Sequence, residues 1–462
     1  MERVRKRWRL FAGGLSGLVA GTAGGIVAIA LLAGGASGGA RADGDLHMTA
    51  AHVPPLLTLP GEHVTLRYAI VCPPPAGGDA CDGAGDVYVR SGRGGAFERL
   101  PLSRGPDSGA GRYFVDLPDR IGSAPDGFSY YAALRDAANG GALVVPSGGA
   151  DAAQRSYRLR NPVMVDLGTD AFGNTEAPSA RVVDARWGSG AGEAGVSGGP
   201  TSLRIGPSSF DVASDGTVTL LDGVNHRVER WRAGHAVATA PVDVPTATND
   251  LAVGADGTIY VLDGASSAGS APLLQTFTPR GVQIRARHIA DRTWSQLRLG
   301  PRGPVVHQEP SEEWMPAQDG ATPLDRAAQA RAGTPGRPLA DGSTLVVLRV
   351  GTGEVRLARI VDDAVRASWR IVSGTPLGEV QLAERWGNRI VLVVKAYSES
   401  RDEFEVLVLD GNGLVRTFAV ASDQWADAAP LAYFRLAGGS LYKLGTGPAG
   451  AFVDRYDLEG AR

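Results

Sequence analysis

Side chains that could do chemistry are spread through this 462-residue sequence without forming a familiar catalytic motif. Seven histidines occur, and no two of them stand at a spacing typical of a metal-ligand pair. The HExxH, P-loop and EF-hand patterns are missing from the sequence. We therefore expect no catalytic residue of these classes, no bound metal and no cofactor.

Polar residues on short apolar segments are better candidates for a binding site. They comprise two carboxylates, two amides and one guanidinium, at Asp211, Asp250, Gln296, Gln381 and Arg435. Such a set could bind a small polar ligand. A catalytic metal needs three or four His or carboxylate ligands that converge, and this set does not supply them.

The elements that position these residues are indicated by a stretch that begins at Arg186, RWGSGAGEAGVSGGPTSLRIGPSSFDVASDGTVTLLDGVNHRVERW. This stretch resembles an NHL repeat, with a Gly-rich entry, a Pro before a strand, an Asp-Gly hairpin and an Asn-His-Arg turn. The resemblance implies a β-propeller in which four residues hold this turn and pack neighbouring blades: Asp222, Asn225, His226 and Arg227. For His226 the alternative is a ligand or catalytic role in the central channel.

Similar strand patterns recur down to the C-terminus, with a second Asp-Gly hairpin at residues 256–257. Repeats of about 40 to 50 residues are typical of propellers. We predict six blades over residues 181–462, with a count of seven left open, and we place the five polar candidates on innermost strands facing the channel. The last blade lacks one strand, and residues 181–187 form an unpartnered strand. Because open sheet edges are exposed, we expect residues 181–187 to complete the last blade.

A further candidate is Trp314, in an acidic segment at residues 308–319 (QEPSEEWMPAQD). We interpret this segment as an insertion in the third blade. An exposed Trp could anchor a partner peptide or a sugar. The alternative is a solvated loop whose Trp caps the blade.

An alternating pattern of short strands also covers residues 61–160 and predicts a β-sandwich that resembles immunoglobulin-like or fibronectin-like modules. We interpret residues 43–60 and 161–180 as linkers. Two cysteines, Cys72 and Cys81, bracket a short loop, and in an oxidising compartment they would form a disulfide.

Export is indicated by the N-terminus, where five basic residues precede a long uncharged segment. Residues 1–42 are either a cleaved signal peptide or a retained transmembrane anchor, and both place the rest outside the cytoplasm, secreted or anchored to the membrane. Without these residues, which hold six basic residues and one acidic residue, the net charge changes from −3 to −8. This charge argues against a nucleic-acid partner.

The fold class that follows is all-β, a sandwich followed by a six-bladed propeller. We expect a non-catalytic recognition or scaffold protein that binds a protein, peptide or glycan of the cell envelope through the propeller face. The alternative is a lyase or a lactonase-type hydrolase of the six-bladed propeller kind.

Overall fold

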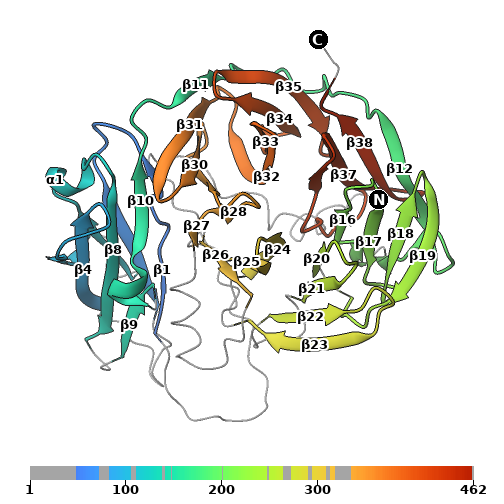
Figure 1. Ribbon diagram of the computed structural model, residues 1–462, viewed down its shortest axis with the longest axis horizontal. Helices are drawn as coiled ribbons and strands as arrows, with labels where there is room; N and C mark the ends of the chain where they lie inside the picture. The colour runs from blue at the N-terminus through green and yellow to red at the C-terminus, as the bar shows by residue number, and fades with distance from the viewer. Residues whose placement is uncertain are drawn as a thin grey trace, which may run out of the picture.

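The computed structural model describes residues 48–71, 83–105, 111–137, 141–146, 148–199, 201–246, 249–263, 272–289, 294–308, 313–317 and 334–459. Its described elements are almost all strands, and they form a ring of sheets with a smaller unit at one side (Figure 1). The all-β class predicted from the sequence is confirmed. The N-terminal segment 1–42 and the Cys72/Cys81 pair lie outside the described residues. No helix within the described ranges is long and apolar enough to cross a bilayer.

The smaller unit is a sandwich of two sheets. One sheet has the order β1 (Thr49–Ala51), β3 (Thr65–Val71), β7 (Arg112–Asp116), β6 (Ser103–Arg104). The other has the order β2 (Leu57–Thr58), β10 (Gln154–Arg158), β8 (Phe128–Asp136), β4 (Gly83–Ser91), β5 (Glu98–Pro101), with β9 (Ala142–Val145) also on β8. A short helix, α1 (Asp119–Gly122), and a single 3₁₀ turn, η2 (Gly149–Ala152), complete the unit. The alternation along β3, with every second residue buried, joins both sheets in one core.

Within the described residues, six sheets of four or five strands form the blades of the propeller (Figure 1). Blade one is β16 (Ser209–Val212), β17 (Val218–Asp222), β18 (Arg227–Arg232) and β19 (His235–Pro241). Blade two is β20 (Asn249–Val253), β21 (Ile259–Asp263), β22 (Leu273–Phe277) and β23 (Gln283–His288). Blade three is β24 (Trp294–Gly300), β25 (Gly303–Gln308), β26 (Glu313–Pro316) and β27 (Thr334–Pro335).

Blades four, five and six have β29, β32 and β36 as their inner strands. Blade four is β29 (Thr344–Val350), β30 (Glu354–Val361), β31 (Ala364–Val372) and β11 (Val163–Asp166), with β28 (Arg337–Pro338) on the inner side. Blade five is β32 (Leu377–Trp386), β33 (Arg389–Tyr397), β34 (Asp402–Asp410) and β35 (Gly413–Ala421). Blade six is β36 (Phe434–Ala437), β37 (Ser440–Gly447), β38 (Gly450–Asp457) and β12 (Ala180–Trp187), with β13 (Glu193–Ala194) beside β12.

The ring closes where the sequence predicted. β12 pairs antiparallel with β38, and Ala185 lies opposite Ala451 in the register. Arg181 of β12 forms a two-pronged ion pair with the buried Asp454 of β38, at 2.9 and 3.2 Å. The two ends of the propeller are therefore held together by backbone pairing and by a charge pair.

Neighbouring blades share apolar cores, which explains the alternation in their strands. Core clusters join blades six and one, one and two, two and three, four and five, and five and six. In the cluster of blades six and one, Phe210 of β16 and Val453 of β38 are fully buried. Blades one, two, five and six thus bury both faces of their sheets against neighbouring blades, as is typical of a propeller.

The boundaries predicted between domains were wrong in two places. Residues 43–60 are not only a linker, because β1 and β2 lie within them and pair in the sandwich. Residues 161–180 are not only a linker, because β11 pairs parallel with β31 as the outer strand of blade four. Farther along the same segment, Thr175 makes a bridge to Ala419 of β35. These short strands gain their stability from partners that are distant in sequence.

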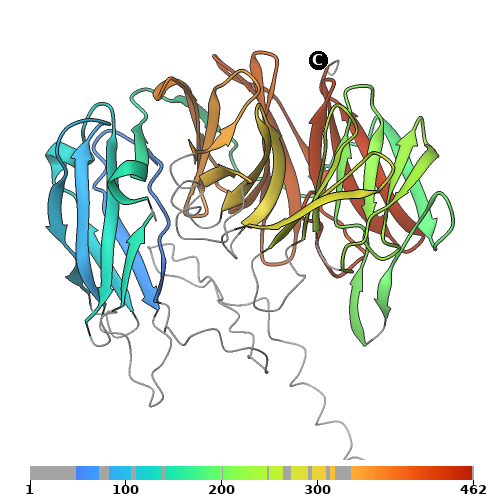
Figure 2. The ribbon, with the colours of Figure 1, turned by 60° about the horizontal axis from the view of Figure 1, so that its bottom comes forward.

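The sandwich stands directly beside the ring (Figures 1 and 2). Apolar residues of β2 and β10 and the segments beside them, including Leu57, share a core with Val346 and Ile360 of blade four. Arg356 of β30, 4% exposed at its side chain, donates a hydrogen bond of 2.9 Å to the carbonyl of Leu57 and one of 2.7 Å to Glu62. The two units are consequently held by an apolar core with a charged clasp at its edge.

Candidate functional site

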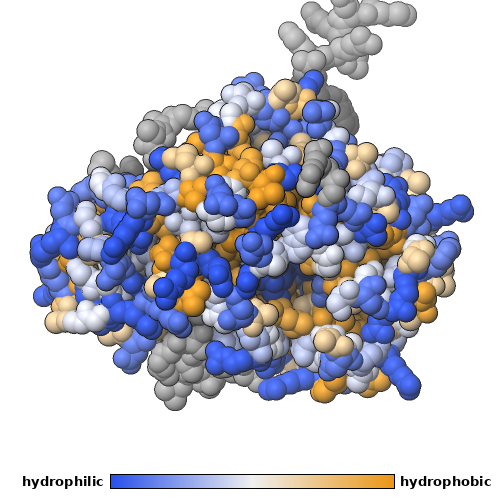
Figure 3. All heavy atoms as spheres, turned by 45° about the horizontal axis from the view of Figure 1, so that its top comes forward, coloured by the Kyte–Doolittle hydropathy of each residue, from blue (hydrophilic) through white to orange (hydrophobic). Residues whose placement is uncertain are grey.

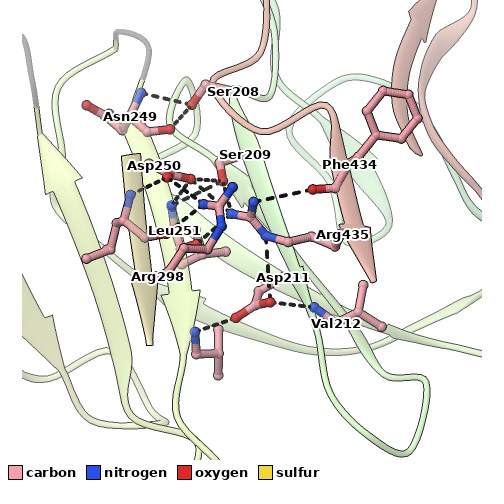
Figure 4. Close-up of polar contacts among 12 residues, drawn as sticks. Ser208, Ser209, Asp211, Val212, Asn249, Asp250, Leu251, Arg298, Phe434 and Arg435 are labelled. Atoms are coloured by element: carbon pink, nitrogen blue, oxygen red, sulfur yellow. Dashed lines mark hydrogen bonds and ion pairs between the residues drawn. The ribbon is translucent and has the colours of Figure 1, made fainter. Parts of the chain in front are cut away.

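The innermost strands of blades one, two, three and six bring a group of charged residues together at the centre of the ring, which we call the central clasp (Figure 4). It consists of Asp211 on β16, Asp250 on β20, Arg298 on β24 and Arg435 on β36. Asp211, Asp250 and Arg435 were candidates in the sequence, and the structure brings these three together. Arg298 was missed.

Asp250 is the centre of the clasp and is completely buried. Its Oδ2 accepts hydrogen bonds from the backbone N–H of Leu297 at 2.7 Å and from Arg298 at 3.1 Å. Its Oδ1 accepts from the Ser209 hydroxyl at 2.7 Å, from the N–H of Leu251 at 2.9 Å and from Arg435 at 3.0 Å. Every lone-pair direction of this carboxylate is therefore used by the protein itself.

The electrostatics of the clasp follow from burial and from opposite charges. Burial alone would raise the pKa of Asp250, but the charges of Arg435 and Arg298 outweigh it, and the pKa lies below its ordinary value. Burial and the like charge of Arg435 lower the pKa of Arg298 to about 10. Burial raises the pKa of Asp211, although Arg435 lies 3.8 Å away and opposes this. The clasp is a compensated set of buried charges.

A second charge pair lies between blades four and five. Arg337 of β28 contacts Glu384 of β32, and both side chains are largely buried. Arg337 is also close enough to Arg298 and Arg435 that their like charges, after burial, lower its pKa. Neither Arg337 nor Glu384 was predicted from the sequence, because nothing local shows which distant strand faces which.

The other predicted site residues lie elsewhere. Gln381 donates a hydrogen bond to Glu379 on its own strand at 3.0 Å, and Gln296 is part-buried on β24 with no hydrogen bond to the clasp. The expectation of an exposed Trp314 was wrong, and only residues 308 and 313–317 of its segment lie among the described residues. Trp314 lies on β26, which pairs with β25, and it is only 9% exposed with its ring 5.1 Å from that of His307. Because this segment is rich in acidic residues and prolines, its sequence did not indicate that β26 is a strand of the core.

The four residues of the turn predicted at residues 222–227 make contacts around the start of β18. Asp222 accepts hydrogen bonds from the side chains of Asn225 at 2.8 Å and Arg227 at 3.0 Å. Arg227 also donates to carbonyls of the segment that follows β12, including that of Glu193. His226 adopts a positive φ of 52° and its Nδ1 lies 2.8 Å from the carbonyl oxygen of Val244. The contacts of Arg227 join blade one to the entry segment from blade six, and that of His226 joins it to the connection toward blade two.

A hollow on one face of the ring is a second candidate site. It has a volume of about 890 Å³ and lies between the hairpin β14–β15 (Ser197–Gly199 and Ser202–Ile205) and residues 425–427. The hairpin precedes the inner strand of blade one, and residues 422–433 precede that of blade six. Both connect an outer strand to the next inner strand, so they emerge on the same face.

A cation–π contact, an ion pair and the packing of two tryptophan rings hold the walls of this hollow. Arg204 of the hairpin lies over the ring of Trp425 at 4.3 Å and forms two hydrogen bonds of 3.0 Å to Asp427. Trp187 packs against Trp425, with ring centroids 5.5 Å apart. Leu203 beside them is 70% exposed. We call this arrangement the Trp425 platform.

One group of carboxylates could hold a metal ion in the described part of the chain. Asp170, Glu403 and Glu405 offer oxygen atoms within 4.8 Å of one another at blade five. Burial and the nearby Asp170 raise the pKa of Glu405 to about 7. The group involves the outer part of the blade and the segment after β11, away from the central clasp.

No protein-family model matches the chain, and no curated protein matches its sequence. Solved structures do resemble it. Virginiamycin B lyase from Staphylococcus aureus is 11% identical, with a TM-score of 0.31 over 55% of this chain and 95% of that one. A puromycin hydrolase is 14% identical, with a TM-score of 0.30 over 86% of this chain and 57% of that one. β-1,2-Mannobiose phosphorylase from Listeria innocua is 10% identical, with a TM-score of 0.26 over 89% and 91%. Likenesses this distant do not bear on function.

Proposed function

We propose that this chain is a recognition protein outside the cytoplasm that binds a peptide or glycan of the cell envelope on the propeller face and does not catalyse a reaction. The observation that supports this most is the hollow beside the Trp425 platform. It has the size of a small-ligand site, and it combines an aromatic ring, an exposed leucine and a fixed charge pair. A flat apolar group of a ligand would pack on such a surface while its polar groups bond to the rim.

The central clasp favours a structural over a catalytic role for the channel. A general acid or base must reach the substrate and exchange a proton with it. Asp250 is enclosed by five donors, and Arg298 and Arg435 are 8% and 6% exposed at their side chains. These groups link the innermost strands of four blades. A binding role stays a prediction for all the candidates that the sequence offered, which are Asp211, Asp250, Gln296, Gln381, Arg435 and Trp314.

The distribution of apolar residues on the surface also supports a binding role for the propeller. Figure 3 shows that, on the face drawn, apolar residues gather over the propeller, whereas the sandwich surface is mostly hydrophilic. Gathered apolar surface is typical of interaction sites. The N-terminal sequence supports a location outside the cytoplasm, and the NHL-like motif supports a relation to propellers of that family.

The test measures binding by the purified full chain on peptide and glycan arrays made from bacterial envelope components. Leu203→Asp places a charge in the hollow, and Met164→Asp places one on another exposed apolar residue, which lies on β11 and is 53% exposed. We expect the Leu203 variant to weaken binding of the strongest array component at least about tenfold, because a charge must then be desolvated against the ligand. The Met164 variant should bind like the wild type.

Two results would contradict the proposal. One is equal binding by both variants and the wild type. The other is a stoichiometric metal ion in the channel, held by at least three side chains, which would favour the lyase or lactonase alternative.

A further inference from the structure

The outer edges of blades one and two differ from those of blades four to six. In blades four and six the outer strands are β11 and β12, and the outer strand of blade five has a bridge to Thr175. The segment between the sandwich and blade one therefore follows these three outer edges. β19 and β23 are the last strands of their sheets, and no described strand pairs with their outer sides. Such edges accept a further strand from another chain.

Apolar side chains are exposed along these two edges. Val237 on β19 is 58% exposed, and Val282 and Ile284 at β23 are 65% and 61% exposed. They are among the most exposed large apolar residues of the described chain. A partner strand would cover them, because alternate side chains of an added strand lie on the faces of the sheet.

A small pocket opens between the same two blades. It has a volume of about 190 Å³ and is lined by Arg230, Ala238, Thr239, Ala240, Pro279 and Arg280. Arg230 comes from β18 of blade one, and Arg280 comes from the turn before β23 of blade two. No carboxylate lines the pocket, and Arg230 makes only a long contact of 3.5 Å to the carbonyl of Gly257. Two cationic groups thus line one small pocket without an anion among the lining residues.

The pocket is held open by close packing of the backbone. Gly281 has a φ of +82°, and a Cβ there would lie 2.1 Å from the carbonyl oxygen of Pro241. The turn that carries Arg280 is therefore pressed against the end of β19, a contact that only glycine allows. Hydrogen bonds between Thr278 and Val282 close this turn. The backbone of Arg280 beside this pocket is therefore held in place before any ligand arrives.

We propose that β19 accepts an extended segment of a partner protein as an added strand, and that an acidic side chain of this segment occupies the pocket between Arg230 and Arg280. Charge complementarity selects the acidic residue, because two guanidinium groups bind a carboxylate well. The exposed side chains of Val237, Val282 and Ile284 favour apolar residues next to the acidic residue of the partner segment. This site lies at the rim of blades one and two and does not depend on the ligand of the Trp425 platform.

The test uses two seven-residue peptides with capped ends, in which valine and threonine alternate around a central residue. This residue is aspartate in one peptide and asparagine in the other. Binding to the full chain is measured by fluorescence anisotropy for the wild type, Arg280→Gln and Arg366→Gln. Arg366 is an exposed arginine of β31 in blade four, so its variant matches the charge change away from the pocket.

We expect the aspartate peptide to bind the wild type and the Arg366 variant equally, and the Arg280 variant about tenfold more weakly. The asparagine peptide should bind the wild type about tenfold more weakly than the aspartate peptide does. Leu203→Asp should leave peptide binding unchanged, which separates this site from the hollow. No binding of the aspartate peptide, or equal binding of both peptides, would overturn the proposal. Binding to phosphatidylglycerol vesicles but not to the peptide would assign the basic rim to a lipid surface instead.

Discussion

Replacing the central carboxylate of the clasp tests how these buried charges stabilise the ring. In Asp250→Asn one oxygen becomes an NH₂ group that faces N–H donors. If Oδ2 is replaced, Leu297 N–H and Arg298 lose their acceptor, and Arg298 is left without its ion pair. Removing one partner of a buried ion pair costs about 3 to 5 kcal/mol. The free energy of unfolding should fall by about this amount.

The matched control is Asp215→Asn. Asp215 pairs with Arg232, but the two side chains are 51% and 62% exposed. An exposed pair contributes about 0 to 1 kcal/mol, so this variant should unfold almost like the wild type. A double variant, Asp250→Asn with Arg298→Met, should lose less than the sum of the two single losses, because the unpaired charge is removed.

Urea and thermal unfolding at pH 7, followed by tryptophan fluorescence, measure these differences. At about 2 to 4 °C per kcal/mol, the single variant should melt roughly 6 to 20 °C below the wild type. The reasoning is refuted if Asp250→Asn and Asp215→Asn unfold at the same temperature. It is also refuted if the double variant loses the full sum.

Three further predictions concern the pH dependence, the closure of the ring and the docking of the sandwich. Burial raises the pKa of Glu313 to about 8, so the contribution of this carboxyl group to stability should fall as pH rises from about 4.5 to 8. Glu313→Gln should remove this contribution, so that the variant loses less stability over this range than the wild type in unfolding titrations. Parallel slopes of the two proteins would contradict the prediction. Cysteines at Ala185 and Ala451, which are register partners, should form a disulfide seen by non-reducing peptide mapping, and two free thiols would argue against the β12–β38 pairing. Arg356→Met should free the sandwich and speed proteolysis between residues 160 and 180, whereas cleavage at the wild-type rate would show that the apolar core alone holds the units together.

Much of the propeller could be predicted because its signals are local. The Asp-Gly turns at residues 215–216 and 256–257 mark hairpins, and the glycines there have φ of +80° and +82°. Closure by β12 could also be predicted, since a strand without a neighbour and a blade without a fourth strand complete each other. β11 was missed because four residues carry too little alternation to be recognised without their partner strand.

The site was harder to predict than the fold. Asp211, Asp250 and Arg435 could be placed near the channel from their positions on inner strands. The hydrogen bonds and ion pairs among them could not be predicted, because they depend on how blades from distant parts of the sequence face each other. Arg298 carries no local sign of its role. The platform at Trp425 was missed because the tryptophans looked scattered until the hairpin and the connection before blade six came together.

The central claim is that the propeller binds its ligand at the face hollow, while the charges of the channel hold the blades together. Amide hydrogen exchange of the full chain, with and without the strongest component from the arrays, tests this directly. We predict new protection at residues 198–199, 201–204, 425 and 427, which line the hollow. Protection confined to the inner strands β16, β20 and β36, with none at the hollow, would contradict the claim.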